Sequence, residues 1–321
     1  MKLLTPPPEV AKAGLRALKM IASAGPHGFG AAARNLLAAA QKHVLKVDID
    51  LDGLAPITPK ELAAAFPPGP LRAQFTQGML MVSLVDGEPT KAQMELVQGF
   101  AAALGVDEPA LAVIRKLADH HTLMFRLDFM RRSHIADVFK DQYRHHGGIG
   151  GVVRGILGMR GVVEDPEVAA RYEALGKLPA GTLGHTFYRH YRDNGFAFPG
   201  EKGGFPEAGV YHDLGHVLGG YGTSPEEEVL IGGFMAGFNK HNPLFVVLFV
   251  FLTFGAGVNV TPLDQPHQEG IFAKPGLADR FFRANERGQA MNTDLADNWD
   301  FWPYMAMPLD AARAKLGVPP E

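Results

Sequence analysis

Apolar residues in this sequence recur at intervals of three and four, which is the spacing of one face of an α-helix. The pattern is clear in residues 10–21 and again in residues 36–45. Alternation of apolar and polar residues, which is typical of strands, is rare: the clearest case, residues 47–51, is short and has no evident partner. Proline and glycine clusters, such as those at 67–70 and 219–220, separate the helical stretches. The sequence therefore predicts an all-α fold.

Length and composition favour two helical domains over one. The chain has 321 residues, of which 46% are hydrophobic and 20% charged, so it can bury more than one core. We place an N-terminal helical region at 1–150 and a second domain at 151–321, with the boundary in the glycine-rich stretch 147–161. Within the first region, residues from about 61 to 125 are predicted to form a small helical bundle.

The charge balance and the residue types exclude several kinds of function. With 31 basic and 34 acidic residues, the net charge is −3, and the chain lacks the electrostatic footprint of a nucleic-acid-binding protein. It has no cysteine, which excludes disulfides, thiolate metal ligands and cysteine nucleophiles. Imidazole and carboxylate groups, including 13 histidines, remain for metal binding or acid–base chemistry. The first residues contain no apolar stretch long enough for a secretory signal, and we expect a cytoplasmic protein.

Two segments have the composition for contact with lipid. Residues 126–160 are rich in arginine, which favours either attraction to the anionic inner face of a membrane or a solvated linker helix. Residues 244–254 are apolar on every side but fall short of the roughly 20 residues of a spanning helix. They are predicted to form either a central helix of the domain or the lining of a site for a lipid tail. The candidates for that lining are Phe245, Leu248, Phe249 and Leu252.

The strongest local signal is the sequence His-Asp-Leu-Gly-His at 212–216. Residues four apart share one face of a helix, so His212 and His216 can bind a single divalent cation. Asp213 lies within the same turn and is a further candidate ligand. This spacing predicts a metal site.

A second helix is predicted to bring another carboxylate to this site. Ser224 has the position of an N-cap, with Pro225 at the first helical position and Glu227 completing a capping box. Glu228 is not needed for the cap. If the two helices pack as an antiparallel hairpin, Glu228 lies at the same end as His216. Two imidazoles and two carboxylates suit zinc, and also manganese or ferrous iron.

The other histidines carry weaker signals. His134, His190 and His241 stand alone, and we expect them to be exposed or to have their hydrogen bonds satisfied within the fold. The doublets at 120–121 and 145–146 lack a second histidine four residues away, and they are minor candidates for a site.

In the N-terminal region, an acidic turn formed by Asp86, Gly87 and Glu88 joins two predicted helices, and the second begins with a capping-box pair, Thr90 and Gln93. This arrangement is similar to the TerB-like helical domain of tellurite-resistance proteins, over roughly 60 residues.

The second half is similar to the Coq-four family of ubiquinone-biosynthesis proteins. The pattern His-Asp-x-x-His, eleven residues and then Glu is met at 212, 213, 216 and 228. The segment 178–184 is similar to the family's entry segment, and residues 287–317, with Trp299, are similar to its closing segment. The likeness covers residues from about 165 to 318. The chain departs from the family pattern at Glu227, at Asp300 and before His212, which bears on the selectivity for the substrate ring.

The Coq-four resemblance implies an all-helical fold and a divalent cation, usually zinc, held by His212, Asp213, His216 and Glu228. It also implies a pocket for a polyprenylated aromatic ring and association with a membrane-bound enzyme complex of quinone biosynthesis, and we expect a homo-oligomer. The implied reaction replaces the C1 carboxylate of a polyprenyl-hydroxybenzoate by a hydroxyl group. Asp213 is the candidate acid–base group.

Three other functions stay open at this point. The chain is a prenyl-lipid-binding scaffold if the metal is purely structural, with four protein ligands and no open position. It is a soluble metallohydrolase if the His-Asp-x-x-His helix works like the His-Glu-x-x-His helix of metalloproteases, although aspartate is shorter than the glutamate base found there. It is a stress-response module if Asp86 and Glu88 bind a cation, where a plain interhelical turn is the simpler interpretation.

Overall fold

The computed structural model describes residues 3–132, 164–260, 267–297 and 299–320. These residues contain fourteen α-helices and no β-strand, apart from isolated bridges between Thr182 and Pro308 and between Ala256 and Glu269. The predicted all-α fold is confirmed. Residues 47–51, the clearest alternating stretch, form no strand. The expected domain boundary at 147–161 lies outside the described residues.

Seven helices form the N-terminal bundle. They are α1 (Pro8–Ser23), α2 (Ala31–Ala40), α3 (Pro59–Ala65), α4 (Pro70–Ser83), α5 (Lys91–Leu104), α6 (Pro109–Ala118) and α7 (Thr122–Arg132). The capping box predicted for Thr90 and Gln93 is confirmed at the start of α5, and Gly105 ends that helix in the left-handed conformation. Helix α1 packs against α3, α4 and α5, so the bundle includes residues well before 61.

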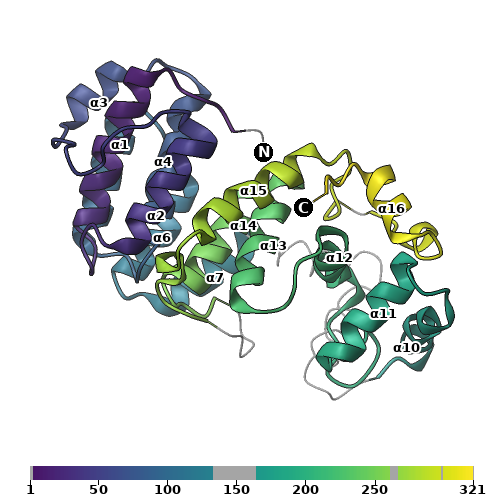
Figure 1. The fold of residues 1–321 in the computed structure, drawn as a ribbon. Helices are drawn as coiled ribbons and strands as arrows, with labels where there is room; N and C mark the ends of the chain where they lie inside the picture. Colours follow the sequence, from purple (N-terminus) through teal and green to yellow (C-terminus); the bar gives the residue numbers. More distant parts are fainter. Residues whose placement is uncertain (1–2, 133–163, 261–266, 298, 321) are drawn as a thin grey trace.

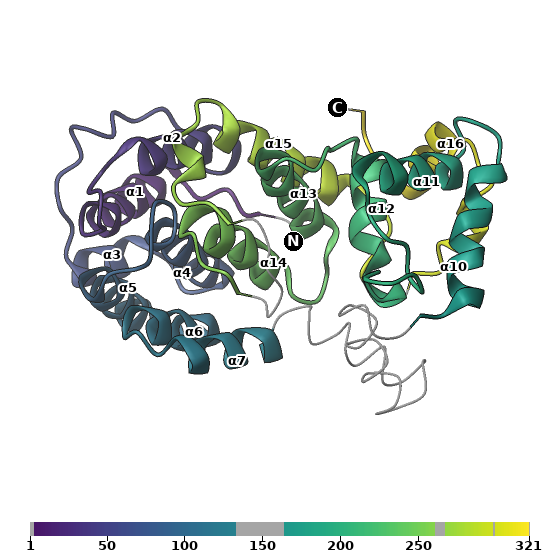
Figure 2. The ribbon, with the colours of Figure 1, turned by 90° about the horizontal axis from the view of Figure 1, so that it is seen from below.

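The remaining seven helices follow residue 163. They are α10 (Pro166–Glu173), α11 (Leu183–Asn194), α12 (Val210–Gly219), α13 (Pro225–Phe238), α14 (Pro243–Val250), α15 (Leu277–Ala290) and α16 (Leu309–Leu316). Helices α10, α11, α12 and α16 gather at the end of the molecule opposite the N-terminal bundle (Figures 1 and 2). Helices α13, α14 and α15 lie between these two ends and contact both.

Glycines allow α13 and α15 to pack backbone against backbone. A Cβ atom added at Gly288 would lie 2.0 Å from the carbonyl oxygen of Phe234, and one added at Gly237 would lie 2.4 Å from that of Asn285. Any side chain larger than hydrogen would therefore separate the helices. Helices α13 and α15 therefore form a close backbone contact between the two ends of the molecule.

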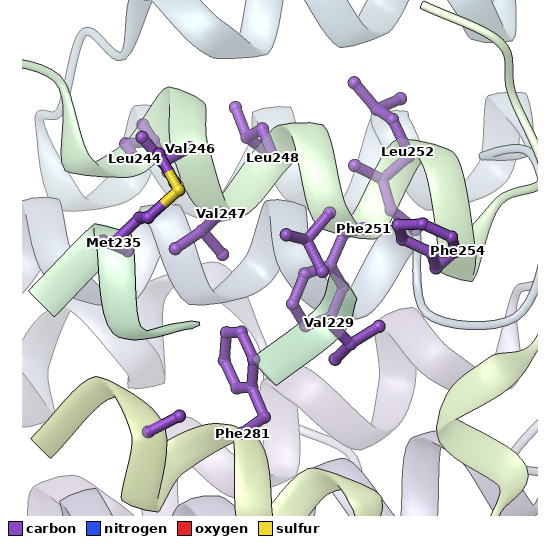
Figure 3. Packing of buried hydrophobic residues seen from close by; sticks show 14 of the residues in the cluster. Val229, Met235, Leu244, Val246, Val247, Leu248, Phe251, Leu252, Phe254 and Phe281 are labelled. Carbon is purple, nitrogen blue, oxygen red and sulfur yellow. The ribbon is translucent and has the colours of Figure 1, made fainter. Parts of the chain in front are cut away.

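The apolar run at 244–254 forms α14 and a π-helical turn, Phe251–Gly255, and α14 lies between the two ends of the molecule (Figure 2). Its buried side chains belong to the apolar cluster in Figure 3. Leu248 and Leu252 have no exposed surface, whereas Phe245 and Phe249 are half-buried. Within the described residues, no helix has both the length and the apolarity needed to cross a bilayer. The run is therefore a central helix, and lipid binding by these four residues stays a prediction.

The N-terminal bundle packs directly on the second half of the chain. Helix α2 contacts α15, and α4 contacts α14. At this junction the buried His43 ring lies 2.9 Å from Asp279 and 3.1 Å from Glu286 of α15. Core packing thus runs continuously across residues from both expected domains.

Candidate metal centre

Helix α12 carries the two histidines of the motif, and its end is well defined. Gly220 adopts the left-handed conformation, with φ +80°, and its N–H donates to the carbonyl of His216. The guanidinium of Arg313 donates to the carbonyls of Val217, at 3.2 Å, and Leu218, at 2.9 Å. Arg287 donates to the carbonyl of Gly219 at 3.0 Å. Two arginines from the C-terminal segment therefore satisfy the free carbonyls of α12 directly behind His216.

Helix α13 begins as predicted, with one difference. The Ser224 hydroxyl accepts a hydrogen bond from the backbone N–H of Glu227. The return half of the capping box is absent, because the Glu227 carboxylate binds the guanidinium of Arg280 at 2.7 Å instead. The cap still leaves Glu228 free to point toward α12.

Three of the four predicted ligands converge. The Nε2 atoms of His212 and His216 lie 3.1 Å apart, and the Glu228 carboxylate oxygens lie 3.6 and 3.5 Å from them. One ligand atom from each of the three residues lies within 4.8 Å of the others. Metal–ligand bonds of about 2.1 Å separate the ligands of a tetrahedral site by about 3.4 Å. The spacing of the three groups therefore fits a divalent cation.

Asp213 is directed away from this cluster. Its Oδ2 atom accepts a short hydrogen bond from the hydroxyl of Tyr191, on α11. Burial and the negative charge of Asp213 raise the pKa of Tyr191 well above 10, so the phenol keeps its proton and remains the donor. The structure thus brings together His212, His216 and Glu228, and it pairs Asp213 with Tyr191.

The electrostatics of the cluster favour a proton on His212 over one on His216. Burial, followed by the charge of His212, lowers the pKa of His216 to about 4. Burial also disfavours protonation of His212, but the hydrogen bond and charge of Glu228 outweigh it and raise the pKa of His212. For Glu228, the two histidines outweigh the effect of burial and lower the pKa. Of these two histidines, His212 is therefore the one that takes up a proton more readily.

His190 lies beside the cluster, and the expectation that it is exposed or satisfied is wrong. Its ring stacks on the ring of His216, with centroids 5.5 Å apart and an interplanar angle of 24°. Its Nε2 atom is buried and has no hydrogen-bond partner among the described residues. Burial lowers its pKa, which favours the neutral imidazole. The sequence could not predict that His190 lies beside His216, because the two residues are on different helices, α11 and α12, which meet only through tertiary packing.

The other candidate histidines lie elsewhere. His241 is exposed and pairs with Asp297 at 3.2 Å, as expected of a histidine on the surface. His120 and His121 lie in the connection between α6 and α7. His134 and the doublet at 145–146 are outside the described residues.

The acidic turn lies between α4 and α5, as predicted. Asp86 is buried, and its Oδ2 atom has no hydrogen-bond partner within the described part of the chain. Burial raises the pKa of Asp86. Glu88 is exposed. Cation binding by this pair stays a prediction.

Comparisons with known proteins give a weak likeness to solved structures. No family model matches the chain, and no curated protein matches it. Among solved structures, the chain is similar to a Nostoc punctiforme protein provisionally described as a ubiquinone biosynthesis protein. The sequences are 18% identical, the TM-score is 0.37, and the match covers 66% of this chain and 97% of the other. A likeness at this level does not define the function of the chain.

Proposed function

We propose that the chain is a metal-dependent enzyme of ubiquinone biosynthesis that acts on a polyprenylated hydroxybenzoate. The observation that carries this proposal is the convergence of His212, His216 and Glu228 at ligand distances. The spacing of these residues is that of the Coq-four motif. The side chain of His216 is 1% exposed, whereas those of His212 and Glu228 are 39% and 29% exposed. The cluster is therefore buried on the side of His216 and reachable from solvent on the side of His212 and Glu228. Substrate binding requires such access.

A set of three protein ligands leaves a coordination position for substrate. Zinc, manganese and ferrous iron all accept two imidazoles and a carboxylate, and we propose zinc, which the Coq-four resemblance implies. When bound, the cation supplies a Lewis acid that stabilises negative charge on a carboxylate or phenolate oxygen of the ring.

The proposed reaction replaces the C1 carboxylate of the ring with a hydroxyl group. The bond between the ring and the carboxyl carbon breaks, carbon dioxide leaves, and an oxygen atom from water bonds to C1. The exchange removes two electrons from the substrate. We propose dioxygen as the external oxidant, which takes up these two electrons with two protons and leaves as hydrogen peroxide. Asp213 accepts a hydrogen bond from Tyr191 beside the cluster, and Asp213 is the group we propose to move a proton during the exchange.

Peripheral contact with a membrane fits a substrate with a prenyl tail. On α7, the side chains of Leu123, Met124 and Leu127 are 72%, 58% and 59% exposed, and Arg126 is exposed among them. An outward apolar face with a basic residue is typical of a helix that lies on an anionic bilayer. The basic stretch beyond residue 132 is outside the described residues.

A scaffold function is the main alternative. Asp213 does not join the cluster, so the closed set of four protein ligands that a purely structural metal favours is not assembled here. For a hydrolase, the residue after the first histidine would have to activate water, and Asp213 is instead paired with Tyr191.

Enzyme and scaffold are distinguished by turnover. Purified protein is loaded with zinc, manganese or ferrous iron and incubated aerobically with a short-tailed prenyl-hydroxybenzoate, and the products are identified by mass spectrometry. We expect loss of carbon dioxide and gain of one oxygen with wild type, and no product with His216→Ala. Complementation of a strain that lacks the C1 step, by wild type but not by His216→Ala, supports the same function in cells. Complementation by His216→Ala would favour the scaffold.

A further inference from the structure

A second site lies between the two halves of the molecule. Helices α1, α2 and α4 of the N-terminal bundle face α13, α14 and α15 across a cavity of about 140 Å³. Phe75 and Met81 of α4 line one side, and Leu244, Val247 and Phe281 line the other. The four residues predicted to bind lipid do not line this cavity, because it borders a different face of α14.

The cavity offers almost nothing to water. Among the described residues, no charged side chain lines it, and the polar side chains that do are Gln74, Gln77 and Asn285. Asn285 donates to the carbonyl of Gly233 at 3.0 Å, and Gln77 donates to Glu108 at 3.2 Å, so both are engaged elsewhere. Apolar cavities of about this size stay dry and take up a hydrocarbon group about as large as a benzene ring.

A short segment of the N-terminus forms part of the cavity wall. Leu3 and Pro6 line the cavity. The backbone of Leu4 is held by the Gln74 side chain, whose amide accepts from the N–H at 2.7 Å and donates to the carbonyl at 2.8 Å. The Gln74 side chain therefore binds residues 3–6 to α4 at the edge of the cavity.

The cavity lies one helix away from the metal cluster. On α13, Met235 contacts His212, with Sδ 3.2 Å from Nδ1, while the next residue, Ala236, lines the cavity. Helix α13 therefore forms a wall with the cluster on one side and the cavity on the other.

We propose that this cavity binds one segment of the hydrocarbon chain of a lipid. The apolar lining and the absence of charged side chains among the described lining residues fit a flexible chain, either an isoprenoid or a fatty acyl group. The identification of the chain as a prenyl tail rests on the proposed function. The proposal that the cavity binds hydrocarbon is independent of that function.

Gly78 of α4 provides a direct test, because it lines the cavity and a Cβ atom placed there would meet no atom within 4 Å. Gly78→Leu fills the cavity from a position where the backbone tolerates a side chain. Gly99 of α5 is the matched control: it also lies within a helix, has the same open surroundings and does not line the cavity. Both substitutions favour the helix, so they differ only in filling the cavity.

The experiment measures binding of a fluorescent polyene fatty acid to the full chain and its displacement by geranylgeraniol or by oleate. We expect Gly78→Leu to bind at least about tenfold more weakly than wild type, with Gly99→Leu unchanged. Equal binding by Gly78→Leu and wild type would overturn the proposal. Stronger displacement by geranylgeraniol indicates a prenyl chain, and stronger displacement by oleate an acyl chain.

Two further measurements separate this proposal from the proposed function. His216→Ala is expected to bind the fluorescent lipid like wild type, because the cavity does not include the metal cluster. If it turns over no substrate and still binds lipid, the two sites are distinct. If Gly78→Leu fails to fold, photolabelling of wild type with a diazirine-bearing isoprenoid replaces it. Labels in α4 and α14 support the cavity, and labels confined to other helices contradict it.

Discussion

The Sδ atom of Met235 lies 3.2 Å from Nδ1 of His212, on the opposite side of the imidazole from the nitrogen that faces His216 and Glu228. Helix α13 therefore supplies both the carboxylate of the cluster, Glu228, and a contact to the partly exposed His212. Such contacts behind a ligand commonly decide its orientation and its affinity for metal.

Metal content should depend on three residues and not on the fourth. We expect His212→Ala, His216→Ala and Glu228→Gln to lose bound zinc, because each removes one of the converging ligands. Asp213→Asn should retain it, because Asp213 is paired with Tyr191. Elemental analysis of the four purified variants beside wild type gives the answer. Full metal content in His216→Ala would mean that the cation binds elsewhere. Loss of zinc in Asp213→Asn would mean that Asp213 is a fourth ligand.

Asp213 should be needed for turnover even with full metal content. Asparagine keeps an oxygen that can accept from Tyr191 but cannot take up a proton at neutral pH. We therefore expect Asp213→Asn to lose activity, and Asp213→Glu to recover a part of it. Activity of Asp213→Asn equal to wild type would exclude the acid–base role.

Zinc affinity should fall as the pH is lowered, because cation and proton compete for His212. The pKa of His212 is raised and that of His216 is lowered to about 4, so a single proton is displaced above about pH 5. Below the pKa of His212, the affinity should fall about tenfold per pH unit. Competition with a chromophoric chelator between about pH 5.5 and 7.5 measures this slope. A hundredfold fall in affinity per pH unit, which is a slope of about two, would mean that zinc displaces a proton from both histidines.

Helix packing at α13 and α15 should not tolerate a methyl group. Gly288→Ala places a Cβ atom 2.0 Å from the carbonyl oxygen of Phe234, which is backbone and cannot rotate away. We expect a loss of about 2–3 kcal/mol in the free energy of unfolding. Gly78→Ala, in open surroundings on α4, should instead gain up to about 1 kcal/mol. Urea denaturation measures the free energy of unfolding of both variants. Equal values would contradict the close contact between α13 and α15.

The outward face of α7 should mediate binding to anionic vesicles. Leu123→Glu together with Leu127→Glu removes apolar surface and adds negative charge, so we expect a clear loss of co-sedimentation with phosphatidylglycerol vesicles. Phe205→Glu, at a residue that is 40% exposed in the C-terminal half, serves as the control. Equal sedimentation of the double variant and wild type would remove α7 from the membrane contact.

Features that depend on neighbouring residues were predictable from the sequence. The capping box of Thr90 and Gln93, the glycine that ends α12 and the shared face of His212 and His216 all involve residues within a few positions of each other. The return half of the box predicted at Ser224 was not, because Glu227 binds Arg280, 53 residues away. Glu228 was also predictable, because the Ser224 cap defines the start of α13. Local backbone geometry is enough to place these side chains.

Only the tertiary structure decided which of the predicted ligands converge. Asp213 belongs to the motif, yet Tyr191, 22 residues earlier, holds it away from the cluster. His190 lies beside His216, and the cavity forms between α4 and α14, because helices far apart in sequence pack together there. Periodicity along a chain specifies which face of a helix is apolar, but not which partner covers that face. The sequence therefore determined the helices and the spacing of the ligands, and side-chain packing decided the composition of the site.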